Sequence, residues 1–274
     1  MIMPELPEVE TTCRALKPLV CGKAITHYTQ RQPKLRWPIP ANLKSCLLDA
    51  VFVAVQRRGK YLLFSFNNRP ERLLVHLGMS GSLRVTDASS PWRKHDHVII
   101  SLDDGMELRL HDPRRFGAVL LDTPQAPHRL LQTLGAEPLT DAFNGEYLAK
   151  QCHKRKVAIK SAIMNGQIVV GVGNIYACEA LFLAGIHPQT PAGKLTDTQY
   201  AQLVDAIKTV LAKAIKQGGT TLRDFVNPAG DRGYFKQTLN VYDRAAQPCK
   251  QCGTAIESRM LNQRNTYFCP NCQR

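Results

Sequence analysis

Four cysteines near the end of the chain have the spacing of a metal site. Cys249 and Cys252 form one pair, and Cys269 and Cys272 form a second pair after sixteen intervening residues. Two turns that each carry a thiolate pair can deliver four sulfur ligands to a tetrahedral zinc ion. Because all four ligands are cysteine, no position remains for a catalytic water, and we predict one structural Zn²⁺. Two disulfides or a chance pattern are the alternatives, and the absence of a recognisable secretory signal disfavours disulfides.

Basic and amide side chains in the second half of the chain could bind phosphate. Lys156 closes the basic run 154–156, and Asn174 follows a glycine-rich stretch, 169–173, ahead of an apolar helical run. Main-chain amides at such a helix start can bind phosphate, although a tight turn between packed helices fits the pattern equally well. Arg264, between the cysteine pairs, could face a phosphate or could be an ordinary solvated charge.

A second group of candidate residues lies in the first half of the chain. Lys60 precedes a strand-like run, Met79 lies among glycines, and Arg114 and Phe116 share one loop. Cations can hold phosphates while Met or Phe fills a gap in an opened base stack. A lone Met or Phe is more often part of a protein core, so this interpretation depends on the other motifs.

The overall charge favours a polyanionic partner. Thirty-six Lys and Arg residues against 22 Asp and Glu residues give a net charge of +14, and nucleic acid is the first candidate. A basic protein without such a partner is the alternative, because net charge reports on association and not on fold. With 44% hydrophobic residues and no apolar run that could cross a bilayer, we expect a soluble, cytoplasmic protein without a membrane partner.

Two kinds of structure must position these residues, and the first is a sheet. A helix is expected from Leu6 to about Val20. Short strand-like runs follow it, at 61–66, 73–76, 82–85 and 98–102. Alternating apolar residues on both sides of the turn at 103–105 predict a hairpin. We therefore expect an antiparallel β-sandwich or barrel preceded by a helix.

Beyond about residue 125 the apolar pattern becomes helical. The clearest helix spans about 197–217, where Thr196 and Gln199 form a capping box. The predicted fold class is therefore α+β. Its domains are an N-terminal β-sandwich at 1–130, a helical domain at 138–240 and a zinc finger at 241–274.

Taken together, these segments resemble the formamidopyrimidine-DNA glycosylases, bacterial enzymes that remove 8-oxoguanine and ring-opened purines from DNA. The resemblance covers almost the full chain. The matching segments are 4–10, 57–62, 76–81, 94–97, 112–117, 171–176, 218–221 and the four cysteines. The resemblance implies that the helical domain is a helix-two-turn-helix unit that precedes the zinc finger.

The resemblance also implies four catalytic residues. Pro4 would be the nucleophile and Glu5 the adjacent acid, while Lys60 would assist β-elimination and Arg264 would assist δ-elimination. A secondary amine that attacks the sugar C1′ forms an iminium ion, which acidifies the C2′ proton and couples base excision to strand cleavage. At pH 7.5 about a quarter of a free α-amine is unprotonated, against about a thousandth of a lysine.

The other implied residues would bind DNA. The DNA backbone would be held by His95, Arg114, Lys156 and Asn174. The gap left by the everted base would be filled by Met79, Arg114 and Phe116, and the loop 226–234 would close over that base. The expected partner is double-stranded DNA with oxidised purines or abasic sites, bound by a monomer.

The start of the sequence departs from the family pattern. Met1, Ile2 and Met3 precede Pro4, whose nitrogen would then be a tertiary amide without a nucleophilic lone pair. We expect translation to begin at Met3 and that methionine to be removed. A protein that keeps these three residues would instead be a non-enzymatic zinc-finger protein that binds damaged DNA.

A related glycosylase for oxidised pyrimidines is a further alternative. The pair Leu6 and Pro7 and the segment 114–116 favour the purine enzymes. Arg223 is a second departure, because some relatives have lysine there, and either cation can serve a phosphate.

Overall fold

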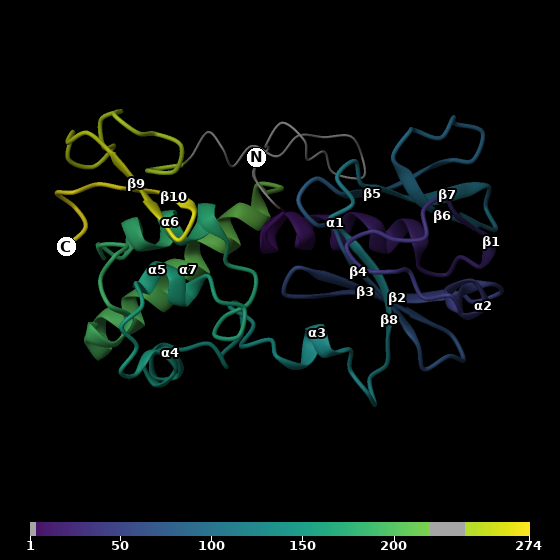
Figure 1. Ribbon diagram of the computed structural model, residues 1–274, viewed down its shortest axis with the longest axis horizontal. Helices are drawn as coiled ribbons and strands as arrows, with labels where there is room; N and C mark the ends of the chain where they lie inside the picture. Colours follow the sequence, from purple (N-terminus) through teal and green to yellow (C-terminus); the bar gives the residue numbers. More distant parts are fainter. Residues whose placement is uncertain (1–3, 220–238) are drawn as a thin grey trace. The chain divides into compact units, whose positions relative to one another are not determined.

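The computed structural model describes residues 4–219 and 239–274 (Figure 1). Residues 1–3, Arg223 and the predicted closing loop 226–234 lie outside the described residues. Among the described residues, no helix is long and apolar enough to cross a membrane. The chain divides into two compact units, which are treated separately below.

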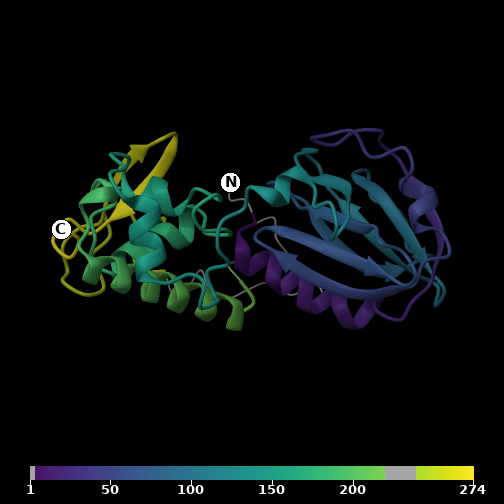
Figure 2. The ribbon, with the colours of Figure 1, turned by 90° about the horizontal axis from the view of Figure 1, so that it is seen from below.

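Helix α1 (Leu6–Val20) begins the first unit, which holds residues 4–132 with 218–219. Pro7 fits the first turn of α1, because main-chain amides there need no helical partner. The Glu5 amide donates to Glu8 Oε2 over 2.9 Å and so caps the helix. The helix runs along one side of the sheets in Figure 2, and its apolar face joins their core.

Two antiparallel sheets of four strands make the β-sandwich. One sheet has the order β1 (Ile25–Gln30), β6 (Asp96–Leu102), β7 (Met106–His111) and β5 (Ser82–Asp87). The other has the order β2 (Phe52–Arg58), β3 (Tyr61–Phe66), β4 (Arg72–His76) and β8 (Ala118–Asp122). Short helices lie in the connections, namely α2 (Leu43–Leu47) and α3 (Arg129–Gln132). The predicted β-sandwich, preceded by a helix, is confirmed.

The predicted hairpin is formed by β6 and β7. Val98 pairs with Leu110 and Ile100 pairs with Leu108, so the alternating apolar residues share one face. These four side chains belong to the core between the sheets. Gly105 has a φ of 80° in the connecting turn, a conformation that glycine adopts without steric cost.

Helices dominate the second unit, which holds residues 133–217 with 239–274. They are α4 (Gly145–Cys152), α5 (Ile159–Ile163), α6 (Asn174–Leu183), the 3₁₀ helix η1 (Ala192–Lys194) and α7 (Asp197–Lys216). The predicted capping box starts α7, because Thr196 Oγ1 accepts from the Gln199 amide and Gln199 Oε1 accepts from the Thr196 amide. Helix α6 is buried over most of its length and contacts α7.

A two-stranded hairpin completes the second unit. Strands β9 (Glu257–Leu261) and β10 (Arg264–Phe268) are antiparallel. Asn262 and Gln263 join them with φ values of 46° and 59°, as a tight two-residue turn requires. Strand β10 packs on α6 (Figure 1). The α+β class predicted from the sequence is confirmed.

Candidate functional site

Pro4 and Glu5 lie immediately before α1, and both residues are buried. Glu5 is the N-cap of the helix, with an extended backbone at φ −98° and ψ −172°. The N-terminus of a helix carries a partial positive charge, which disfavours a cation beside it. Pro4 therefore lies at the N-terminal end of α1, next to the Glu5 carboxylate.

Glu8 connects the start of α1 to Gly219. Its Oε2 accepts from the Glu5 amide. Gly219 has a φ of 82°, and a Cβ added there would lie 3.1 Å from Glu8 Oε1. The glycine thus permits a close approach between the chain at Gly219 and this carboxylate. Glu8 was missed in the sequence, although its position three residues after Glu5 matches a capping box.

Lys60 lies in the turn between β2 and β3, near the partly buried side chain of His76. The ring of Tyr61, the next residue, lies 4.9 Å from the His76 ring. Burial lowers the pKa of His76 to about 4, and the charges of Lys60 and Arg36 act in the same direction. His76 Nδ1 accepts from the Gly78 amide over 3.0 Å, so the neutral ring carries its proton on Nε2. His76 begins the matching segment 76–81, but the sequence predicts no role for it.

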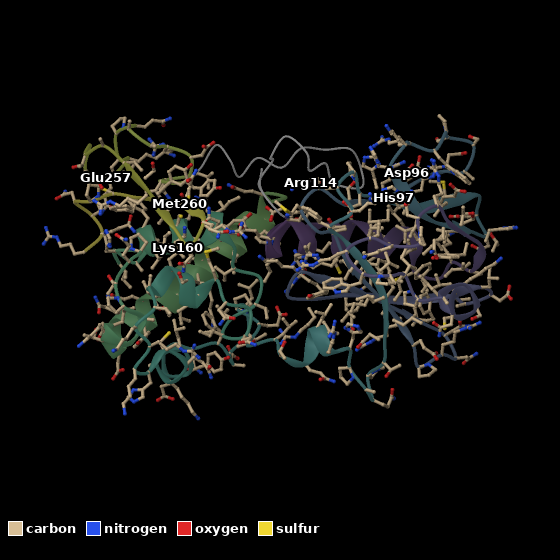
Figure 3. All side chains as sticks on the ribbon, viewed as in Figure 1. Asp96, His97, Arg114, Lys160, Glu257 and Met260 are labelled. Atoms are coloured by element: carbon tan, nitrogen blue, oxygen red, sulfur yellow. The ribbon has the colours of Figure 1, made fainter. Side chains whose placement is uncertain are left out.

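The loops that carry Met79, Arg114 and Phe116 meet backbone to backbone. A Cβ on Gly78 would lie 2.4 Å from the carbonyl carbon of Phe116, so only glycine allows this approach. The Arg114 guanidinium lies 4.7 Å from the centre of the Phe116 ring, which is a cation–π contact. Phe116 is 42% exposed and therefore is not a core residue. The structure thus brings these three predicted residues into adjoining loops, with Arg114 labelled in Figure 3.

Asp112 closes the loop that carries Phe116. Its Oδ2 accepts from the Gly117 amide over 2.8 Å, and its carbonyl oxygen lies 3.0 Å from His97 Nε2. Burial raises the pKa of Asp112 and lowers the pKa of His97. His95, the predicted phosphate ligand, lies edge-on to His97 with the ring centres 5.8 Å apart. The buried residues Asp112 and His97 therefore connect the end of the loop that carries Phe116 to His95.

In the second unit, Asn174 is linked to the strand that carries Arg264. Asn174 is the first residue of α6, where main-chain amides point toward a prospective anion. Its Nδ2 donates to the carbonyl oxygen of Asn265 over 2.9 Å, and its buried Oδ1 has no hydrogen-bond partner among the described residues. Lys156, which lies in the connection before α5, is exposed. Arg264 is also exposed, one residue before Asn265.

The four cysteines converge on one point of the second unit. Their Sγ atoms all lie within 4.8 Å of one another. Cys252 Sγ lies 3.4 Å from Cys269 Sγ, and Cys249 Sγ lies 4.0 Å from Cys272 Sγ. A disulfide needs about 2.05 Å, whereas four sulfurs around zinc at about 2.3 Å are separated by distances of this order. The residues fit one structural zinc ion, and disulfides are ruled out for these four cysteines.

The predicted site residues divide between the two units. The first unit contains Pro4, Glu5, Lys60, Met79, His95, Arg114 and Phe116. The second contains Lys156, Asn174, Arg264, Cys249, Cys252, Cys269 and Cys272. The sequence interpretation also missed Lys160, which is buried in α5. Its place inside an otherwise mainly apolar segment was the available signal, because lysine is rarely buried without a partner.

Models of three protein families match the chain in sequence order. Residues 3–119 match the formamidopyrimidine-DNA glycosylase N-terminal domain, residues 134–226 match the formamidopyrimidine-DNA glycosylase H2TH domain, and residues 246–274 match the zinc finger found in FPG and IleRS. The formamidopyrimidine-DNA glycosylase of Alcanivorax borkumensis is 53% identical over 99% of this chain and 100% of its own length. The corresponding enzyme of Hydrogenovibrio crunogenus is 55% identical over 99% of this chain and 97% of its own length.

Solved structures show the same similarity. The MutM (Fpg) protein from Thermus thermophilus is 36% identical, with a TM-score of 0.86 over 98% of both chains. The Lactococcus lactis Fpg in complex with DNA containing an abasic site is 32% identical, with a TM-score of 0.90 over 98% of this chain and 99% of that one. A MutM in complex with DNA containing carbocyclic 8-oxo-G is 34% identical, with a TM-score of 0.91 over 99% and 100% of the two chains. The similarity therefore spans both units.

Proposed function

This chain belongs to the formamidopyrimidine-DNA glycosylase family, and we propose that it excises oxidised purines from DNA and cleaves the strand at the resulting abasic site. The observation that carries the proposal is the place of Pro4, directly before the first turn of α1 in the unit that also carries Lys60 and Phe116. The whole-chain similarity to named glycosylases supports it, and the bound DNA of two structural relatives supports DNA as the partner. The activity is that of a bifunctional glycosylase and AP lyase in base excision repair.

In the proposed mechanism Pro4 attacks the damaged nucleotide. Its nitrogen must be a free secondary amine, which requires a protein without Met1–Met3. The lone pair forms a bond to C1′, the bond from C1′ to the base breaks, and the base leaves with a proton. Cleavage of the C1′–O4′ bond then opens the sugar and gives an iminium ion and a C4′ hydroxyl. Glu5, next to Pro4, is the proposed group that supplies and accepts protons in these steps.

Two eliminations follow from the iminium ion. Loss of the C2′ proton expels the phosphate on C3′, and loss of the C4′ proton then expels the phosphate on C5′. Hydrolysis of the remaining iminium frees Pro4. We propose that Lys60 assists the first elimination and Arg264 the second. Because a guanidinium stays protonated, Arg264 can act only by binding the departing phosphate, and its role depends on its position.

The remaining predicted residues are proposed DNA contacts. The phosphate ligands would be His95, Arg114, Lys156 and Asn174. The residues that fill the space of the everted base would be Met79, Arg114 and Phe116. Unstacking a base costs a few kcal/mol, and the exposed Phe116 ring beside a cation is suited to offset part of that cost.

The organisation of the protein follows from these roles. We propose three functional parts, which are a catalytic sandwich at 1–130, a helix-two-turn-helix domain at 138–240 and a zinc finger at 241–274. The proposed working form is a cytoplasmic monomer on double-stranded DNA of the nucleoid. The zinc ion is structural, because its four ligands leave no position for substrate.

Cleavage of a duplex that contains one 8-oxoguanine tests the proposed function. The protein that begins at Pro4 should release the base and cut the strand. A matched protein that keeps Met3 should bind the duplex but lose at least about a thousandfold in base release, because the nucleophile is then an amide. Equal activity of the two proteins would exclude Pro4 as the nucleophile, and no activity in either would exclude the glycosylase assignment.

A further inference from the structure

Helix α5 carries a buried cation that contacts the zinc hairpin, β9–β10 with its turn. Lys160 is 1% exposed and is labelled in Figure 3. Its Nζ donates to Thr266 Oγ1 over 2.6 Å and to the carbonyl oxygen of Asn265 over 3.4 Å. Burying an ammonium group is costly unless hydrogen bonds compensate for the lost water. The bonds therefore tie α5 firmly to β10, immediately after Arg264.

The next residue of α5, Ser161, contacts the hairpin at a residue that precedes Arg264 in the sequence. Asn262 Nδ2 donates to Ser161 Oγ over 2.7 Å. Asn262 is the first residue of the hairpin turn and lies two residues before Arg264. Two consecutive residues of α5 thus contact the hairpin on both sides of Arg264.

One carbonyl oxygen links this arrangement to a proposed phosphate ligand. The carbonyl of Asn265 accepts from Lys160 Nζ and also from Asn174 Nδ2, over 2.9 Å. Asn174 begins α6, so α5, α6 and β10 meet at this oxygen. The positions of Asn174 and Arg264 are therefore coupled within the second unit.

The zinc ion alone cannot hold Arg264 in place. The cysteine ligands flank the open end of the hairpin, since Cys252 precedes β9 and Cys269 follows β10. Arg264 lies at the turn end, which is five residues or about 16 Å along the strand from Cys269. A two-stranded hairpin has little stability of its own. The turn end thus depends on contacts other than the metal, and α5 and α6 supply them.

We propose that Lys160 and Ser161 are positioning residues that hold Arg264 for the second elimination. This inference rests on the proposed role of Arg264 in binding the departing phosphate. Freeing the turn lets the guanidinium sample more positions, so the phosphate on C5′ is bound for a smaller fraction of the time. The product of β-elimination then accumulates relative to the product of δ-elimination, while base excision by Pro4 is affected less.

Ser161→Ala is the first test, because it removes one hydrogen bond without leaving a buried charge. Base release and the two cleavage products are measured under single-turnover conditions on an 8-oxoguanine duplex, together with zinc content. We expect the ratio of δ to β product to fall about threefold to tenfold, with zinc content unchanged and base release changed by less than the ratio. Ser161→Thr keeps the hydroxyl and should restore the ratio. Ser258→Ala, the same change at an exposed position of β9, should leave the ratio at its original value.

Variants of Asn262, which is the hydrogen-bond partner of Ser161, and of Lys160 complete the test. Asn262→Ala should lower the ratio as Ser161→Ala does, and the double variant should show no additional fall, because both changes remove the same bond. Lys160→Met keeps the length of the side chain and should lower the ratio further. If Lys160→Met loses zinc or fails to fold, the Ser161 and Asn262 variants still test whether α5 positions Arg264.

Each alternative outcome identifies what is wrong. An unchanged ratio in Ser161→Ala and Asn262→Ala, with a lowered ratio in Arg264→Ala, would overturn the positioning role and leave the role of Arg264 intact. An equal fall of base release and both eliminations would indicate a general structural effect and would also overturn it. If Arg264→Ala itself keeps the original ratio, the proposed function of Arg264 fails first.

Discussion

The two units hold the proposed site residues by different means. In the first unit, Pro4, Lys60 and Phe116 are carried by a β-sandwich whose apolar core is continuous with α1. In the second unit, Arg264 is carried by a hairpin whose local core is small. That core consists of Cys178, Phe182, Val241, Cys249, Ile256 and Cys269. Two of these residues are zinc ligands, so metal binding there contributes to folding directly.

This difference separates the proposed nucleophile, Pro4, from Arg264, the residue proposed for the second elimination. A nucleophile must be held rigidly to form a covalent bond, and apolar burial provides that rigidity without a cofactor. The hairpin instead depends on zinc at one end and on polar bonds at the other. The two units should therefore respond differently to loss of metal, to loss of core volume and to acid.

Removal of zinc should have the largest effect, and it should be confined to the second unit. Structural zinc contributes about 10–16 kcal/mol of apparent binding free energy in small zinc modules, so Cys269→Ser or chelation should unfold the hairpin. Hydrogen exchange should then be fast in β9 and β10 and remain slow in β2 to β8. Loss of protection in the sandwich as well, or a protected hairpin without zinc, would contradict the claim that zinc stabilises the second unit alone.

A cavity in the sandwich should destabilise the first unit and leave the zinc site of the second unit intact. Phe64 is fully buried and packs edge-on against Phe52 with ring centres 5.8 Å apart, so Phe64→Ala should cost about 3–5 kcal/mol of unfolding free energy. Both tryptophans of the chain, Trp37 and Trp92, belong to the first unit, and their fluorescence reports on it in a urea titration.

The zinc content of the folded Phe64→Ala protein should equal that of the unaltered protein. Val53→Ala provides the control, because Val53 is 53% exposed in the same sheet, and it should cost less than about 1 kcal/mol. A similar cost for both variants would show that the sandwich core does not carry the stability of the first unit.

Acid should weaken the first unit through His76. Its pKa is about 4 in the folded protein against an ordinary value of 6.5, because burial disfavours the charged ring. The unfolded chain binds the proton first, so the stabilisation is complete above pH 6.5 and is lost as the pH falls toward 4. The loss is at most about 3 kcal/mol.

His76→Gln removes the titrating group and should flatten this part of the pH profile. Urea midpoints at pH 7 and pH 4.5, followed by tryptophan fluorescence, measure the difference between the two proteins. Parallel profiles for the original protein and the variant would show that His76 does not contribute to acid sensitivity.

The fold was largely predictable because its signals are local. Helix α1, the β6–β7 hairpin and the capping box of α7 depend on residues within a few positions of one another. The cysteine pairs predict a zinc site for the same reason, since each pair occupies one turn. Those features follow from periodicity, turn residues and spacing, which a single sequence contains.

The supports of the site were not predictable, because they join distant residues. Lys160 and Asn265 are 105 positions apart, and Ser161 and Asn262 are 101 positions apart. No periodicity in the sequence brings such pairs together, and the contact exists only once β10 packs on α6. The roles of Pro4, Glu5, Lys60, Arg264 and the DNA-contact residues remain predictions that the experiments above are designed to test.

The central claim is that the nitrogen of Pro4 forms the covalent bond to the sugar. Sodium borohydride reduces an iminium ion to a stable amine, so treatment during the reaction with an 8-oxoguanine duplex traps the enzyme on DNA. Proteolysis and mass spectrometry then locate the sugar remnant. We predict that it is attached to the peptide that begins at Pro4. An adduct on Lys60, or an active protein that forms no reducible adduct, would contradict this account.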